Sequence, residues 1–116
     1  MGYRSDVFIA LTEKNVKKMV QVLSDEIILE LLQGCDRYEK NGWTLFRWPD
    51  VKWYDGYELV DGIMTFLADL EDSEDPEENE GYSLTILGED QDDYTQKGAF
   101  DTPFGIRLVR QIEFDL

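Results

Sequence analysis

Apolar and polar residues follow two different periods along the chain, and these periods predict its elements. Residues 6–11, DVFIAL, form a short, apolar and partly β-branched run that predicts a buried strand. Apolar residues then recur every three or four positions over 16–31, as in an amphipathic helix that is capped by Thr12 and ends near Gly34. Ser24 leaves a second interpretation open, because it can cap a new helix after a break.

The middle of the chain combines a turn signal, an aromatic run and a second helical period. Asn41-Gly42 is typical of a turn, and residues 43–48, WTLFRW, have the composition of a strand. Pro49 interrupts this run, so the region is either one bent strand or two short ones, with Pro49 at an edge or a bulge. Apolar spacing over 56–70 predicts a second helix.

The last third of the chain predicts two more strands. Residues 82–87, YSLTIL, alternate as in a half-buried strand, and residues 106–116 alternate as one final strand. We expect loops at about 71–81 and about 88–105. Two helices packed on one face of a mostly antiparallel sheet of four to five strands would bury every apolar stripe. The pattern therefore predicts an α+β fold, with residues 1–116 forming a single domain.

The charge of the chain is concentrated in one segment. The formal net charge is −15, and residues 53–96 hold fifteen Asp or Glu and no Lys or Arg. The other 72 residues hold 11 acids and all 11 bases, so the excess lies in this block. Clustered like charges repel one another and disfavour the compact state, whereas solubility alone would be served by charges spread over the surface. The clustering therefore favours a functional role for these acids. The alternative is that each acid belongs to a solvated loop or helix face.

Composition excludes several kinds of site. The chain has no histidine, which removes the commonest general base and zinc ligand, and one cysteine, Cys35, which excludes an intramolecular disulfide. Neither acidic cluster matches the Ca²⁺ loop of an EF-hand, and no glycine-rich phosphate loop is present. We therefore expect no enzyme activity, no cofactor and no specific metal site.

The N-terminal residues limit the cellular location of the protein, and the sign of its charge limits the class of partner that it can bind. Residues 1–14 show no signal peptide, and no apolar stretch is long enough for a membrane helix, so we expect a cytoplasmic protein without a membrane anchor. Direct contact with nucleic acid would need a basic face. An acidic surface can instead imitate the spaced phosphates of nucleic acid and attract a basic protein.

The candidate partner-binding residues are acids of the second helix, the following loop and a later turn, together with two aromatics of residues 48–57, WPDVKWYDGY, one of which we expect to be exposed. They are Glu58, Asp61, Asp69, Asp72, Glu74, Asp75, Glu77, Glu78, Glu80, Glu89, Asp90, Asp92, Asp93, Trp53 and Tyr54. The acids form one surface only if folding brings residues 69–80 beside residues 89–93.

Three segments carry a resemblance to a known group of proteins. MGYRSDV at 1–7, WPDVKWYDGY at 48–57 and LGEDQDD at 87–93 resemble small acidic proteins encoded by bacteriophages and prophages. The resemblance transfers no catalytic residue. It implies a phage origin, a host bacterial cell as the setting, and a small inhibitor of a host system, such as an anti-CRISPR or anti-restriction protein.

These observations together predict an inhibitor whose acidic surface blocks a basic, nucleic-acid-handling host protein, for example a CRISPR-Cas protein. One alternative is a phage structural or assembly protein that forms a homodimer or larger oligomer through the aromatic segment. The other is a domain that binds a cation or a small ligand.

Overall fold

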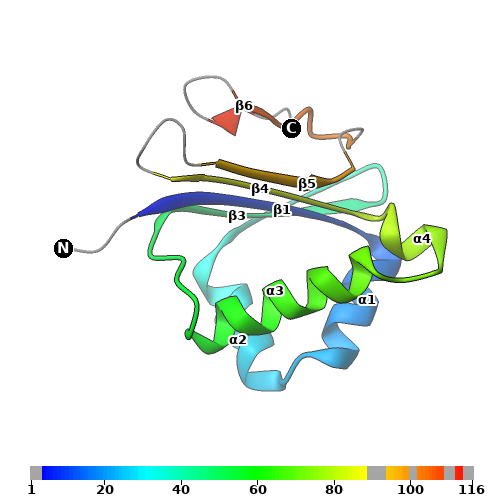
Figure 1. Ribbon diagram of the computed structural model, residues 1–116, viewed down its shortest axis with the longest axis horizontal. Helices are drawn as coiled ribbons and strands as arrows, with labels where there is room; N and C mark the ends of the chain where they lie inside the picture. The colour runs from blue at the N-terminus through cyan, green and yellow to red at the C-terminus, as the bar shows by residue number, and fades with distance from the viewer. Residues whose placement is uncertain (1–3, 89–93, 100–101, 109–111, 114–116) are drawn as a thin grey trace.

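The chain folds as α+β around a five-stranded antiparallel sheet (Figure 1). The computed structural model describes residues 4–88, 94–99, 102–108 and 112–113. The elements are β1 (Ser5–Thr12), α1 (Glu13–Val22), α2 (Asp25–Gly34), β2 (Asp36–Lys40), β3 (Trp43–Val51), α3 (Glu58–Glu71), α4 (Pro76–Asn79), β4 (Tyr82–Gly88), β5 (Tyr94–Gly98), β6 (Arg107–Leu108) and β7 (Ile112–Glu113). The predicted fold class is confirmed.

The large sheet has the order β2-β3-β1-β4-β5, with every neighbouring pair antiparallel. Its central strand, β1, is the apolar run DVFIAL, and residues 7–11 are buried on both faces. Helices α1, α2 and α3 cover one face, whereas β6 lies on the opposite side (Figure 1). The helix face buries Val7, Ile9 and Leu11, and the other face packs Phe8 and Ala10 against Phe104.

The first predicted helix is two helices, which settles the alternative left open at Ser24. The Ser24 hydroxyl accepts a hydrogen bond from the backbone N–H of Ile27 at 3.3 Å and caps α2. α2 ends at Gly34, as expected. The second predicted helix, α3, begins at Glu58 and ends at Glu71.

β3 is one strand that continues through Pro49, so the single bent strand is the correct alternative. Its pairing with β1 shifts between Ser5 and Val7, and Asp50 has a positive φ of 51°. The Asp50 backbone N–H donates to the Asp6 carboxylate at 2.8 Å, which stabilises the bulge. Pro49 lies in this bulge, where the register gives it no partner on either β1 or β2.

Four local expectations were wrong or incomplete. The expected loop at 88–105 contains β5, and the expected loop at 71–81 contains the one-turn helix α4. The expected single strand over 106–116 is replaced by a small hairpin in which Leu108 of β6 pairs with Ile112 of β7. β4 is buried on both faces from Tyr82 to Thr85, because the segment around Phe104 covers the side that alternation assigned to solvent.

Candidate protein-binding surface

The two acids in the first turn of α3 have a local structural role. Glu58 and Asp61 lie at the helix N-terminus, where the helix dipole favours negative charge. The Asp61 carboxylate also accepts a hydrogen bond from the Gly56 backbone N–H at 3.0 Å. Both side chains are exposed. The formation of α3 therefore accounts for these two charges without a partner.

Three acids of the stretch 69–80 form ion pairs with lysines of α1. The Lys14 ammonium lies 2.6 Å from the Asp75 carboxylate and 3.0 Å from that of Glu77. Lys18 pairs with Glu78 at 2.7 Å, and the Glu78 side chain is only 15% exposed. The segment is free of bases in sequence, but folding brings two bases onto it. Asp75, Glu77 and Glu78 are therefore partly neutralised within the chain.

The same segment has a network of its own around α4. Asp75 caps α4 by accepting from the Glu77 backbone N–H at 3.0 Å. The Ser73 hydroxyl donates to the second Glu78 oxygen at 2.6 Å, and the Asn79 amide donates to the Ser73 carbonyl at 2.8 Å. Residues 73–80 are thus an ordered turn.

A buried asparagine fixes this turn to α1. The Asn15 side chain is fully buried, and its amide donates to the carbonyls of Glu78 at 3.1 Å and Gly81 at 3.0 Å. Gly81 has no room for a side chain, because an added Cβ would lie 2.6 Å from the Asn15 amide nitrogen and 2.8 Å from the Thr12 hydroxyl. Thr12 N–H also donates to the Gly81 carbonyl at 3.0 Å. This packing places α4 at one end of the sheet, beside α1 (Figure 1).

The ion pairs change the acidity of the paired carboxyls. The Lys14 ammonium holds the pKa of Asp75 below its ordinary value, mainly through their hydrogen bond. Lys18, and then the Ser73 hydroxyl, lower the pKa of Glu78. Lys14 in turn has a raised pKa, because it donates to Asp75 and Glu77. These carboxyls are therefore charged in the folded protein at neutral pH.

Five other acids of this region are not paired with a lysine among the described residues, and we call them the acidic end. They are exposed and form no ion pair with a side chain in the described part of the chain: Asp69, Glu71, Asp72, Glu74 and Glu80. The first three lie in the last turn of α3 and at its C-cap, with no base in that turn. A helix C-terminus disfavours negative charge, so this placement opposes the helix dipole.

Glu71 was missing from the sequence-based candidates. It lies in the last turn of α3 close to Tyr82, the first residue of β4, whose pKa is raised by its burial and then by the nearby Glu71 and Asp72 charges. The signal that could have identified Glu71 is an acid, rather than a base, at the predicted end of a helix. The acidic end therefore runs from the end of α3 to the start of β4.

The second group of candidate acids belongs to the segment between β4 and β5. Glu89, Asp90, Asp92 and Asp93 lie outside the described residues. The residues that flank them, Gly88 and Tyr94, lie at the far end of β4 from Glu80, with Tyr94 paired to Leu87. The seven residues of β4 span roughly 20 Å at about 3.3 Å per residue. The described strands thus place the chain on either side of residues 89–93 away from the acidic end.

Both aromatic candidates, Trp53 and Tyr54, are half-buried. The Trp53 ring lies 5.2 Å from the buried Trp48 ring, measured between centroids, and Trp53 packs against the main core. Tyr54 is half-buried and lies 5.8 Å from the ring of Tyr57. Both residues lie after β3 rather than within a strand, so strand alternation does not place them on opposite faces. The exposed ring of this region belongs to Tyr57, at 48%.

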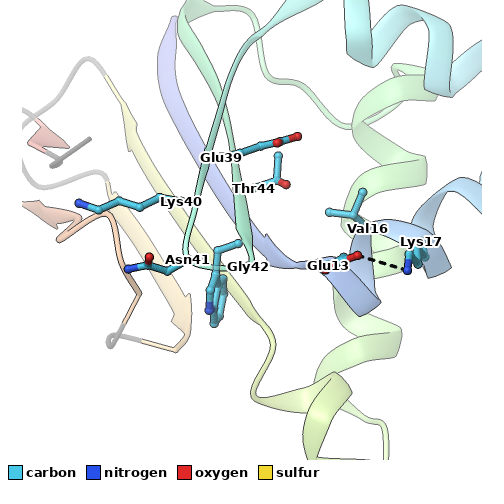
Figure 2. Close-up of a pocket in the computed structure, with 9 residues that line it drawn as sticks. Glu13, Val16, Lys17, Glu39, Lys40, Asn41, Gly42 and Thr44 are labelled. Atoms are coloured by element: carbon cyan, nitrogen blue, oxygen red, sulfur yellow. Dashed lines mark ion pairs between the residues drawn. The ribbon is translucent and has the colours of Figure 1, made fainter.

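A groove of about 520 Å³ lies between α1 and the β2–β3 hairpin (Figure 2). Glu13, Val16 and Lys17 line it from α1, and Glu39 and Thr44 line it from the two strands. Glu13 and Lys17 form an ion pair with each other at 3.3 Å. The described residues contain no group of three or more side chains suited to hold a metal ion. No helix among them is long and apolar enough to cross a membrane.

No protein-family model matches the chain, and no curated protein or solved structure matches it. The arrangement of the acidic end is therefore the basis for a functional proposal.

Proposed function

We propose that the protein is a non-enzymatic inhibitor whose acidic end binds the basic groove of a nucleic-acid-handling protein. The placement of Asp69, Glu71 and Asp72 against the dipole of α3 carries this proposal. Folding alone would favour bases at that helix end, so the acids there call for another role. Binding a cationic surface is such a role.

The charge that remains after internal pairing supports the same proposal. Residues 69–80 hold eight acids, and the structure pairs two lysines, Lys14 and Lys18, with three of them. A strong negative potential therefore remains at this end of the molecule. Acids one helical turn apart lie about 5–6 Å from each other, a spacing comparable with that of phosphates along a strand. Such a surface would raise the rate of association with a basic groove.

The ordered turn around α4 gives the acidic end a rigid support. Because residues 73–80 are fixed by Asn15 and the α1 lysines, Glu74 and Glu80 need little further ordering on binding. The resemblance to phage proteins supports a host defence protein as the target, and a setting inside the bacterial cell.

Capture of a partner from bacterial lysate, followed by elution with either salt or duplex DNA, tests the proposal. We expect the partner to be released by DNA, because DNA competes for the same groove. The variant D69N/D72N/E74Q is expected to lose capture. The control E26Q/E30Q/D55N removes the same amount of charge from exposed sites elsewhere and is expected to retain capture of the partner. Equal capture by both variants, or no release by DNA, would contradict the proposal.

A further inference from the structure

The outer edge of β2 is a candidate interaction surface. β2 lies at the end of the sheet, and β3 is its one neighbour among the described strands. The two-residue turn Asn41-Gly42 pairs Lys40 with Trp43, and both turn residues have positive φ, 51° and 81°. In such a hairpin the residue pair beside the turn is hydrogen-bonded, and the following pairs are alternately non-hydrogen-bonded and hydrogen-bonded. Residues of a non-hydrogen-bonded pair direct their backbone N–H and C=O groups away from the partner strand. The backbone groups of Arg37 and Glu39 therefore point away from β3.

The residues of β2, DRYEK, have a symmetric arrangement of charge. Asp36 and Lys40 lie at equal distances on either side of Tyr38, and so do Arg37 and Glu39. Each of these pairs joins opposite charges. A strand with this pattern is complementary to itself when a second copy runs antiparallel and Tyr38 lies at the centre.

We propose that the protein forms a homodimer by pairing β2 with β2 of a second copy about a twofold axis at Tyr38. In this register Arg37 of each copy lies opposite Glu39 of the other, and Asp36 lies opposite Lys40 of the other. The outward N–H and C=O groups of Arg37 and Glu39 then form four hydrogen bonds between the copies. The two five-stranded sheets become one continuous sheet.

The backbone pattern permits this register, and the charge pattern selects it from the neighbouring registers that the backbone also permits. The outward groups belong to Arg37 and Glu39, which are the two residues that meet when Tyr38 is central. A shift by two residues in one direction would place Arg37 opposite Arg37 of the second copy, and a shift in the other would place Glu39 opposite Glu39. Like charges directly opposite each other destabilise strand pairing, so the neighbouring registers are disfavoured.

The Arg37–Glu39 contacts are the better of the two sets for a test. Asp36 already forms an ion pair with Arg47 within the chain, at 3.4 Å. Arg37 and Glu39 are exposed, and neither forms an ion pair with another described residue. The five residues of β2 carry no net charge, although the whole chain has −15. Salt at about 0.15 M, where the Debye length is about 8 Å, screens distant acids while retaining contacts within β2.

Sedimentation equilibrium at this salt concentration tests the proposal, with the intact chain and two charge-reversed variants. We expect a concentration-dependent dimer for the wild type. R37E places glutamates opposite each other at two positions, and E39R does the same with arginines. Each variant alone is expected to dimerise at least about tenfold more weakly. The control K97E reverses an exposed base on β5, at the opposite edge of the sheet, and is expected to retain the dimer.

Mixing the two variants supplies the decisive measurement. In a pair of R37E with E39R, every central contact again joins opposite charges, so the mixture is expected to form a heterodimer. The double variant R37E/E39R is expected to form a homodimer. A monomeric wild type would overturn the proposal, and so would an R37E dimer as tight as that of the wild type, or a mixture that dimerises no more tightly than either variant alone. Loss of the dimer in L29D, with R37E dimerising as tightly as the wild type, would place the interface on the exposed side of α2 instead.

Discussion

Single residues show why the ion pairs that the acids of residues 69–80 form within the chain could not be predicted. Lys14 and Asp75 are 61 positions apart in the sequence, and Lys18 and Glu78 are 60 apart. Counting charges along the chain marks the block as free of bases, but only the packing of α4 on α1 shows which acids are paired. The caps at Thr12 and Ser24 depend on residues three positions away, so the sequence could show them: Thr12 was predicted as a cap, and Ser24 was one of the two alternatives left open.

Asn15 is expected to be the side chain on which the turn at residues 73–81 most depends. N15A removes both donated hydrogen bonds and leaves the Glu78 and Gly81 carbonyls without that donor, which should lower the free energy of unfolding by about 1–3 kcal/mol. The control Q21A alters an exposed residue of the same helix, and we expect a change within about 0.5 kcal/mol. Urea unfolding measures both. Equal effects would mean that the buried amide is dispensable.

The paired carboxyls predict how stability depends on pH. The pKa values of Asp75 and Glu78 are lowered in the folded state, so their contribution is present above the unfolded values near 4 and is lost as pH falls through the folded values. D75N/E78Q should therefore be less stable than the wild type at pH 7, with a smaller difference at pH 3. Urea unfolding at both pH values checks this. A difference independent of pH would assign the effect to packing.

At the scale of elements, prediction succeeded where apolar periodicity is strong and failed where it is weak. The core faces of α1, α2, α3, β1 and β4 all follow apolar spacing. β2 was not predicted, because DRYEK contains no apolar alternation, and its pairing depends on the Asn41-Gly42 turn and on β3. β5 was assigned to a loop for the same reason, since YTQKG is mostly polar.

The ends of α3 predict opposite responses to the same substitution. E71K and D72K each place a base at the helix C-terminus and should raise the free energy of unfolding by about 0.3–1 kcal/mol. E58K places a base in the first turn and should lower it by a similar amount. Thermal and urea unfolding of the three variants test this comparison. Destabilisation by E71K and D72K would show that the acidic end contributes to folding, and would remove the main support for a binding role.

At the scale of the molecule, the two proposed interaction surfaces lie on different parts of the fold. The acidic end lies where α3, α4 and β4 meet, whereas the neutral strand β2 lies at the sheet edge, three strand positions from β4. Adjacent strands are about 4.8 Å apart, so β2 and β4 are separated by roughly 14 Å. A dimer through β2 would leave both acidic ends accessible, and would present two of them to a basic partner.

The excess of negative charge also predicts how salt affects the stability of the whole protein. With a net charge of −15, mutual repulsion of the acids should outweigh the few exposed ion pairs, so added salt should stabilise the fold by screening. We expect the Tm to rise by several degrees, on the order of 1 kcal/mol of stability, between about 0.02 and 0.5 M NaCl. The variant E71K/D72K has a net charge of −11 and should show a smaller rise. Thermal unfolding followed by circular dichroism measures both slopes at one protein concentration, so that dimer formation affects them equally. A Tm that falls with salt would mean that the Lys14 and Lys18 ion pairs outweigh the repulsion, and that the acidic end has less free charge than its proposed role requires.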